Sequence, residues 1–316
     1  MSVEADANLI EAWSALHPAA DGVHQVVSIE RVQGAAATKD ERGRPLIFCP
    51  AGGEPIHALA LQSVRLTHGV VVRLQSNGPI SEQRVSVVKC LAEDPSMYPL
   101  FLRCLAASLP KVELERTQKG VDTAVRQLVD LFAQLTGIGA PASGLWAELL
   151  MIASAKDPRS MLTAWHPVGK QRHDFILEGV RLEVKSTVGD QRAHQFGLEQ
   201  LQTGEGVRLC IASVLLEATD AGTTLDALRL RCLAAAGLDD ELRLKVDRLC
   251  VEYLGNGWSA GLGAAFDEQA AAASFRFFSG DVIPRPLAPP GVSGVRFVAD
   301  CEGLEEASDI GAGFTH

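Results

Sequence analysis

The sequence predicts an α/β protein of the mixed α+β kind, with an N-terminal β-rich region ahead of a larger part that contains both strands and helices. Three observations support this prediction. Apolar runs broken by Gly, Pro and Asn fill residues 23–90, apolar residues recur at helical spacing between residues 97 and 154, and residues 173–185 read as a tight β-hairpin. We place the boundary so that residues 1–112 form the N-terminal region and residues 113–316 form a core with a C-terminal extension.

In the N-terminal region, strands are expected at the runs PLIFCP, IHALALQSV and GVVVRLQ, each of which is bounded by turn-forming residues. Helices are expected next, at residues 97–109 and at about 115–135, where apolar side chains return every three or four positions before Gly137. Beyond the hairpin, VRLCIASVLLEA predicts a buried strand over residues 207–218, and helices are expected across residues 223–254.

A further helix is expected over residues 143–154, with Ser143 as its N-cap and an apolar stripe that includes Leu145 and Leu149. Glu148 lies on that stripe. An acid turned toward a core is costly unless a cation or hydrogen bonds receive it. The alternative is that Glu148 lies at the edge of the stripe and reaches solvent or an arginine.

The pairing register of the hairpin can be derived from its sequence. Gly179 supplies the positive φ of a two-residue turn, so Phe175 faces Leu182 and Asp174 faces Glu183. Side chains alternate between the two faces of a strand. One face therefore carries Phe175, Leu177, Val180, Leu182 and Val184, and the other carries Arg172, Asp174, Glu183 and Lys185.

Two carboxylates directly opposite one another repel, and a divalent cation between Asp174 and Glu183 removes that penalty. Mg²⁺ suits such a site because it binds one or two carboxylates and keeps several waters. Lys185 points to the same side and could orient an attacking water. The alternative is a solvated face on which diagonal opposite charges offset the one like-charge pair. The hairpin alone leaves both interpretations open.

Composition restricts the class of protein. The chain has 316 residues, of which 47 % are hydrophobic, with no apolar run long enough to span a membrane and no export signal at MSVEADANLIEAW. We therefore expect a cytoplasmic protein with no membrane partner. Seven cysteines without a Cys-x-x-Cys pair indicate reduced thiols rather than disulfides or a zinc ribbon.

The formal charge of −10 is concentrated at the two ends of the chain. Residues 1–22 and 299–316 contain acids and no Lys or Arg, whereas residues 30–90 hold eight basic and five acidic side chains. A chain with this charge balance is expected to bind a polyanion such as DNA only modestly by itself, so that a partner would have to supply the rest.

A helix bearing Glu148, then Asp174 at a strand start, then Glu183-x-Lys185 on the next strand resembles the PD-(D/E)XK nuclease superfamily. His173 stands where that motif usually has its proline. The wider sequence resembles the bacterial "PD-(D/E)XK motif protein" family associated with restriction-modification loci. The segments that support this resemblance, in order between about Gly144 and Asp300, are GLWAELL, HD…LEVKST, RAHQFGLEQL, FRFFSGDVIPRPL and GVSGVRFVAD.

The resemblance implies a restriction-endonuclease-like core, in which helices flank a mixed β-sheet. It implies that Asp174 and Glu183 bind Mg²⁺, for which Mn²⁺ can substitute, with the Val184 carbonyl as a further ligand. Lys185 would position the hydrolytic water, and Glu148 would support the metal or orient water. The segment after the motif strand, in or before a short helix, would contact the scissile phosphate through Arg192, His194 and Gln200, while Gln195 is better explained as an ordinary polar residue on the surface of the helix.

The function implied is a Mg²⁺-dependent endodeoxyribonuclease in a restriction or phage-defence system. DNA is the substrate expected, a homodimer would serve double-strand cutting, and methyltransferase or ATPase subunits of a defence system are the expected protein partners. The alternative is a catalytically silent subunit with a nuclease fold that recognises DNA or assembles a complex. Metal titration distinguishes the two, because only a catalytic site is stabilised by Mg²⁺ or Mn²⁺.

Overall fold

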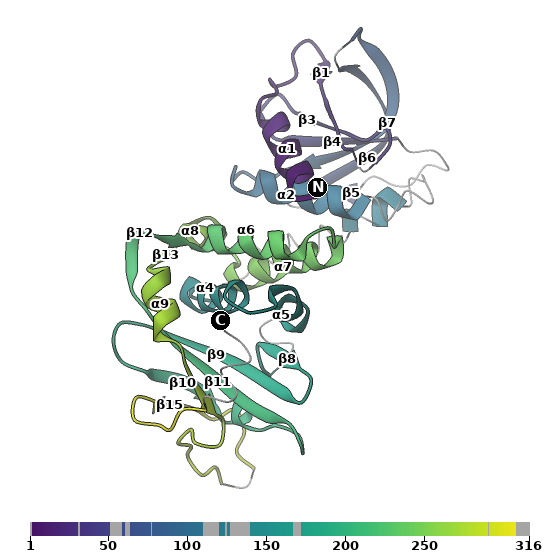
Figure 1. Ribbon diagram of the computed structural model, residues 1–316. Coiled ribbons are helices and arrows are strands. Elements are labelled where there is room, and N and C mark those ends of the chain that lie inside the picture. The colour runs from purple at the N-terminus through teal and green to yellow at the C-terminus, as the bar shows by residue number, and fades with distance from the viewer. Residues whose placement is uncertain are drawn as a thin grey trace. The chain divides into compact units, whose positions relative to one another are not determined.

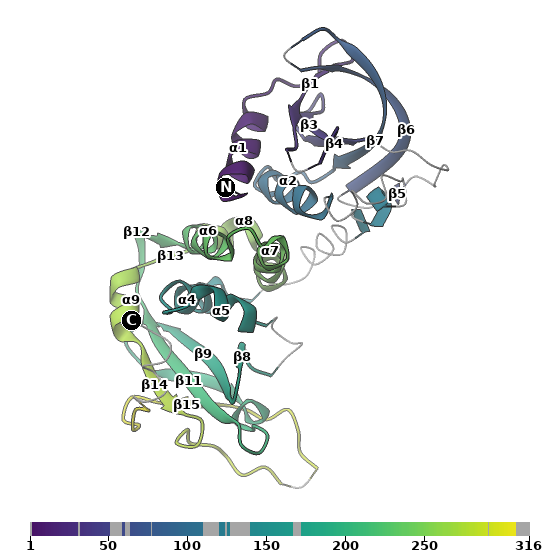
Figure 2. The same ribbon diagram turned by 45° about the vertical axis from the view of Figure 1, so that its right-hand side comes forward.

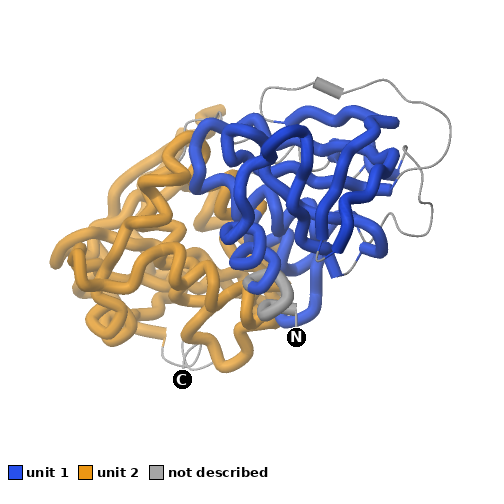
Figure 3. Tube along the Cα trace, turned by 90° about the horizontal axis from the view of Figure 1, so that it is seen from above, with its two compact units in different colours: residues 1–137, 237–247 blue, residues 138–236, 248–316 orange. Residues whose placement is uncertain are grey.

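The computed structural model describes residues 2–30, 32–50, 59–60, 64–76, 78–109, 120–123, 125–126, 140–166, 172–289 and 291–307, and gives only the backbone at residues 2–7 and 59–60. The chain forms two compact units (Figure 3). One contains residues 1–137 and 237–247, and the other contains residues 138–236 and 248–316. The division falls within helix α7 (Asp240–Leu254). The predicted boundary at residue 112 lies outside the described residues.

The first unit is built around one curled sheet (Figure 2). Its elements are α1 (Ser2–Ser14), β1 (Val23–Gln25), β2 (Val27–Ser28), β3 (Ala36–Lys39), β4 (Pro45–Cys49), β5 (Leu59–Ala60), β6 (Val64–Gln75), β7 (Ser81–Cys90) and α2 (Met97–Ser108). The strand order is β1-β6-β7-β4-β3-β2, with β5 beside β6. The predicted N-terminal β-rich region is thus confirmed. Of the run IHALALQSV, however, residues 56–58 and 61–63 lie outside the described residues.

This sheet closes on itself through a single short segment. Only Val26 separates β1 from β2, and these strands pair with the opposite edges of the sheet, β1 in parallel with β6 and β2 antiparallel with β3. The resulting barrel has an apolar interior of alternating residues, which are Leu46, Phe48, Val72, Leu74 and Val85 with Val26, Val70 and Val87 packed against them.

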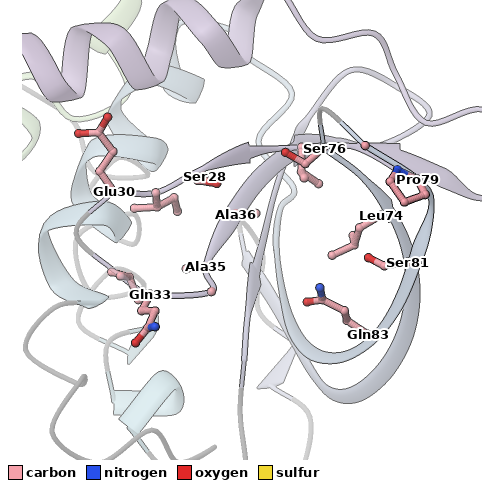
Figure 4. A pocket seen from close by; sticks show the side chains of 15 residues that line it. Ser28, Glu30, Gln33, Ala35, Ala36, Leu74, Ser76, Pro79, Ser81 and Gln83 are labelled. Atoms are coloured by element: carbon pink, nitrogen blue, oxygen red, sulfur yellow. The ribbon is translucent and has the colours of Figure 1, made fainter.

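A cavity of about 360 Å³ is lined by residues of this barrel and of the segment between β2 and β3. Its wall includes Val26 and Leu74 from the barrel, and Figure 4 shows the polar side chains of Gln33 and Gln83 at its edge. Among the described lining residues Glu30 is the one that carries a charge. The cavity therefore offers hydrogen-bonding groups and apolar surface, but no described cation for a phosphate.

The second unit contains a four-stranded mixed sheet with the order β14-β11-β9-β8. Strands β9 and β11 are parallel, while β8 and β14 are antiparallel to their neighbours. The elements are α4 (Ala142–Ala153), α5 (Pro158–Ala164), β8 (Phe175–Leu177), β9 (Val180–Val188), β10 (Ala193–Gly197), the 3₁₀ helix η2 (Leu198–Leu201), β11 (Arg208–Leu216), β12 (Ala218–Thr224), α6 (Leu225–Ala236), α8 (Trp258–Leu262), β13 (Ala265–Phe266), α9 (Glu268–Ser274), β14 (Arg276–Ser279) and β15 (Arg296–Asp300). The prediction of a mixed α/β fold is confirmed.

Helices pack against this sheet, and a separate two-stranded ribbon of β10 and β15 lies beside it (Figure 1). Helix α4 packs against β9 on one side and against α6 on the other. Strands β10 and β15 form an antiparallel pair, whose Phe196 packs with Ile211 of β11 and Phe278 of β14. In the parallel pairing Ile211 lies beside Glu183, so both side chains point to the same face of the sheet, toward the ribbon.

The predicted hairpin register is confirmed, because Phe175 pairs with Leu182 and Leu177 pairs with Val180. Gly179 has a φ of 67°, as the turn requires. The predicted helix over residues 97–109 and the helices across 223–254 are confirmed, as is the strand over residues 207–218. Most of the helix predicted at about 115–135 lies outside the described residues.

Two smaller predictions have different outcomes. Ser143 is not an N-cap, because α4 begins at Ala142 and Pro141 occupies the capping position without a side-chain hydrogen bond. The seven cysteines are all free and buried, as expected for reduced thiols. Within the part of the chain that the structure describes, no helix is both long and apolar enough to cross a membrane.

Candidate active site

Glu148 lies in the middle of α4 and is 4 % exposed. Its Oε2 accepts a hydrogen bond of 2.6 Å from Nε1 of Trp165, the residue that directly follows α5. Such a partner offsets part of the cost of removing a carboxylate from water. The interpretation in which Glu148 reaches solvent or an arginine at the edge of the apolar stripe is therefore wrong.

Asp174 directly precedes β8 and is half-buried. Its Oδ2 accepts a hydrogen bond of 2.8 Å from the backbone N of Val184 on the neighbouring strand. Its carbonyl accepts another, also of 2.8 Å, from the backbone N of His166. These two bonds hold the backbone and the carboxyl group of Asp174 at the end of the hairpin that lies opposite the turn.

Glu183 and Lys185 are two residues apart on β9 and therefore point to the same face. Lys185 Nζ lies 2.7 Å from Glu183 Oε1. Gln200 of η2 donates from Nε2 to the same Oε1 at 2.6 Å, and its own Oε1 accepts from Lys185 at 3.3 Å and from the backbone N of Gly197 at 2.8 Å. The three side chains thus form a closed ring of hydrogen bonds.

The other oxygen of Glu183, Oε2, is buried and accepts no hydrogen bond from the described residues. Glu183 as a whole is 3 % exposed, so the interpretation of this hairpin face as solvated is wrong for Glu183. A buried anionic oxygen without a donor is costly, and native structures seldom leave one unless a water or an ion completes it. Oε2 is therefore the atom at which a cation would fit.

The three acids affect one another electrostatically. Burial, followed by the negative charge of Glu183, raises the pKa of Glu148 from 4.5 to about 8, although the bond from Trp165 opposes the rise. Burial and the charges of Glu183 and Glu148 raise the pKa of Asp174 well above its usual value. The charges of the three predicted acids therefore act on one another, and Lys185 and Gln200 are bonded directly to Glu183.

A family model described as "Putative PD-(D/E)XK family member, (DUF4420)" matches residues 9–301 of the chain. The chain belongs to this PD-(D/E)XK family. The match extends over both units, the N-terminal barrel included. No curated protein and no solved structure matches the chain.

The PD-(D/E)XK assignment agrees with the second unit as described. A mixed sheet, with α4 and α9 packed against it, is the α+β arrangement expected of this superfamily. The proline of the PD-(D/E)XK motif is replaced by His173, which is buried and lies 2.8 Å through Nε2 from the carbonyl oxygen of Gln200. His173 therefore connects the strand that bears Asp174 to η2, which bears the Gln200 side chain.

The described residues do not contain three His, Cys, Asp or Glu side chains that already stand as a complete metal-binding group. One oxygen of each acid is engaged by the protein, at Glu148 Oε2, Asp174 Oδ2 and Glu183 Oε1. Mg²⁺ does not need a full protein cage, because it binds through one or two carboxylates and keeps several waters. The unpaired Oε2 of Glu183 fits that requirement.

Arg192 and His194 are hydrogen-bonded to groups other than the three acids. Arg192 is 3 % exposed, and its guanidinium donates to the carbonyl and hydroxyl of Ser213 and to the carbonyl of Ser274. His194 is 2 % exposed, between the hydroxyls of Thr187 and Ser213. Burial and the positive charges of Lys185 and Arg192 lower the pKa of His194 to about 4. Neither side chain is open to a phosphate in this structure.

The remaining predicted residues fall in three places. Gln200 is bonded to Glu183 and Lys185 instead of standing open to substrate, and Gln195 is exposed on β10. Val184 contributes its backbone N to Asp174, whereas its role as a metal ligand through the carbonyl stays a prediction. The segment after β9 is strand β10 followed by the 3₁₀ helix η2, so Gln200 lies in the expected short helix and Arg192, His194 and Gln195 lie before it.

Two side chains near the acids were missed from the sequence. Trp165 binds Glu148 from the end of α5, and Tyr253 of α7 places its hydroxyl against Gly144 of α4. Neither residue belongs to a local motif, because each reaches the site through tertiary packing. The one signal in the sequence is Gly144, a residue without a side chain one helical turn before Glu148.

Proposed function

We propose that this chain hydrolyses phosphodiester bonds of DNA in a Mg²⁺-dependent reaction, as an endonuclease of a cytoplasmic restriction or phage-defence system. The observation that supports it best is the unpaired, buried Oε2 of Glu183, beside Asp174, Glu148 and the ammonium group of Lys185. Membership of the PD-(D/E)XK family supports the nuclease class.

Glu183 through Oε2 and Asp174 through Oδ1 would hold the cation, with the Val184 carbonyl and Glu148 in support. Mg²⁺ in such a position polarises a phosphate oxygen and lowers the pKa of bound water. Mn²⁺ has the same preference for oxygen ligands and would substitute. The raised pKa values of Asp174 and Glu148 fit this assignment, because carboxyl groups that repel one another gain most from a bound cation.

The chain's own residues would act as follows. Gln200 and Lys185 hold Glu183 by its Oε1, so that its other oxygen is directed away from them. The Lys185 ammonium stabilises negative charge that develops on the phosphate. The water oxygen would form a bond to phosphorus and give up a proton to solvent, while the bond from phosphorus to the leaving sugar oxygen breaks and that oxygen takes up a proton from solvent.

Partners are part of the same proposal. A net charge of −10 does not favour strong binding of a polyanion, so we expect weak DNA affinity for the isolated chain. Methyltransferase or ATPase subunits of a defence system would supply the remaining affinity, and a homodimer would allow both strands to be cut.

The test is cleavage of supercoiled plasmid DNA with and without Mg²⁺, for the chain alone and with the products of neighbouring genes. Glu183→Gln and Lys185→Met should abolish nicking. Glu178→Gln is the matched control, because Glu178 is an exposed acid at the turn of the same hairpin. If the wild type cuts and the two site variants cut equally well, this assignment of the site is wrong.

A second candidate is a nuclease-fold subunit that recognises DNA or assembles a complex without turnover. The lack of a preformed group of three metal ligands among the described residues, together with the acidic balance, favours it. Titration with Mn²⁺ separates the two candidates. A catalytic site should raise the melting temperature of the wild type and not that of Glu183→Gln, whereas a silent subunit should show no response in either.

A further inference from the structure

Most of the hydrogen-bond donors around the three acids are already engaged. Lys185 Nζ donates to Glu183 and Gln200, Gln200 Nε2 donates to Glu183, and Trp165 Nε1 donates to Glu148. The oxygens of a phosphodiester can only accept hydrogen bonds. A phosphate at this site can use the third N–H of Lys185, and a further phosphate oxygen needs a donor that the protein has not already used.

Tyr253 is such a donor. It lies in the last turn of α7, half-buried, and its hydroxyl packs directly on Gly144 in the first turn of α4. A β-carbon at Gly144 would overlap this hydroxyl, so the absence of a side chain there is what admits the phenol. Residues four apart share a helix face, so the hydroxyl lies one turn from Glu148 on the same face of α4.

The phenol is a neutral donor under all ordinary conditions. Burial, and then the negative charges of Glu148, Asp174 and Glu183, raise its pKa above its usual value. Among the described residues no group is hydrogen-bonded to its hydroxyl, although all three carboxylates lie close enough to act on it. The backbone carbonyl of the same residue accepts from Ala140 N at 2.8 Å, which fixes this end of α7 before α4 begins.

We propose that the Tyr253 hydroxyl donates a hydrogen bond to a phosphate oxygen of the DNA substrate, and that Gly144 is the residue that lets it reach there. This inference rests on the proposed nuclease function and extends it by naming a residue that contacts the substrate. The side chains of Arg192 and His194 are buried and hydrogen-bonded to other groups. Tyr253 therefore takes the phosphate-contacting role that the family resemblance gave to them.

Tyr253→Phe removes the hydroxyl and keeps the ring. We expect the dissociation constant for a 20-base-pair duplex, measured by fluorescence anisotropy with Ca²⁺ in place of Mg²⁺, to rise about threefold to tenfold, the worth of one hydrogen bond. Plasmid cleavage with Mg²⁺ should slow by at least that factor. Mn²⁺ affinity should stay unchanged, because Tyr253 donates to no metal ligand. Tyr98→Phe is the matched control, since Tyr98 is the other tyrosine of the chain and lies in α2.

Gly144→Ala tests the geometry. The new methyl group overlaps the Tyr253 hydroxyl but stands 3.2 Å from its Cζ, a distance that small shifts can accommodate. We therefore expect Gly144→Ala to lower the melting temperature, and the double variant with Tyr253→Phe to recover it. Cleavage by the double variant should remain at the level of Tyr253→Phe. This pattern separates the effect of the Gly144–Tyr253 contact on stability from the contribution of the Tyr253 hydroxyl to cleavage.

The outcomes are distinct. A wild type that neither cuts nor binds the duplex, alone and with the products of neighbouring genes, refutes the proposed function, and this inference with it. A wild type that cuts, beside a Tyr253→Phe variant that binds and cuts equally well, refutes the role of Tyr253 alone. If Tyr253→Phe loses Mn²⁺ affinity and melting temperature in parallel with cleavage, the residue has a structural role and makes no contact with substrate.

Discussion

Gln200 and Lys185 share a single oxygen atom of Glu183. Gln200 Nε2 lies 2.6 Å from Oε1 and Lys185 Nζ lies 2.7 Å from it, whereas Oε2 of the same carboxylate is buried without a donor. The carboxylate is thus held through Oε1, and Oε2 is left to bind another group. This asymmetry makes Gln200 a positioning residue for Glu183.

Gln200→Leu should weaken Mn²⁺ binding and slow plasmid cleavage by about tenfold, because a hydrogen bond to a charged group contributes roughly 1.5–3 kcal/mol and Lys185 remains to hold part of the geometry. Calorimetric titration and the cleavage assay measure both effects. Gln195→Leu, at an exposed position on β10, is the control and should behave as the wild type. Equal metal affinity in both variants would contradict the positioning role.

The stability of the metal-free protein should fall as pH rises from about 4.5 to 8. Folding raises the pKa of Glu148 from 4.5 to about 8, so in this window the unfolded chain is ionised while the folded chain keeps the proton. Linkage then lowers the free energy of unfolding with increasing pH, and Asp174 acts in the same direction. Thermal melts across this range should show the decline, and Glu148→Gln should reduce its slope.

Added Mn²⁺ should reverse this decline, since a cation binds the ionised carboxylates and competes with their protons. The increase in melting temperature that Mn²⁺ produces should therefore be larger at pH 8 than at pH 6. A metal effect that does not depend on pH would argue against binding at these carboxyl groups.

Trp165→Phe removes the indole N–H that binds Glu148 Oε2 at 2.6 Å while keeping an aromatic ring in the core. That hydrogen bond lowers the pKa of Glu148, so its loss should raise the pKa further and shift the pH dependence of Mn²⁺ binding to higher pH. Titrations at several pH values measure the shift. Trp258→Phe, in α8, provides a control with the same change of residue and should leave the profile in place.

Ser213→Ala should destabilise the fold by about 1–3 kcal/mol, the usual cost of leaving buried polar groups without a partner. The Ser213 hydroxyl lies 2.9 Å from a guanidinium nitrogen of Arg192 and 2.7 Å from Nε2 of His194, and the residue is fully buried. Urea unfolding measures the change. Ser143→Ala is the comparison, and we expect it to cost less than 0.5 kcal/mol, roughly the limit for surface sites, because α4 makes no capping bond through a side chain.

Local patterns predicted the hairpin, and tertiary packing decided what lay beyond them. The turn at Gly179 fixes the register over a few residues, so the positions of Asp174 and Glu183 follow from the letters between them. The apolar stripe around Glu148 correctly indicated a buried acid. Its partner Trp165 is 17 residues away and joins it only because α5 folds back beside α4.

The expectations for Arg192 and His194 show the opposite case. Polar residues after the motif strand suggest an open surface, but β15, about a hundred residues later in the chain, pairs with β10 and helps to enclose them. Periodicity cannot reveal which distant strand will cover a segment. Tyr253 was missed for the same reason, since no local pattern around it indicates that it will contact Gly144.

Helix α7 restricts how this protein can be cut into independently folding fragments. Helix α7 starts in the N-terminal unit and ends at Leu254 in the nuclease-like unit, and its Asp247 pairs with Arg103 of α2 at 3.2 Å. A fragment that begins after residue 112 would lack Arg103, and removing one partner of a buried ion pair typically costs about 3–5 kcal/mol. Fragments that contain only the nuclease-like unit should therefore express poorly, and the two units are best purified and engineered as one chain.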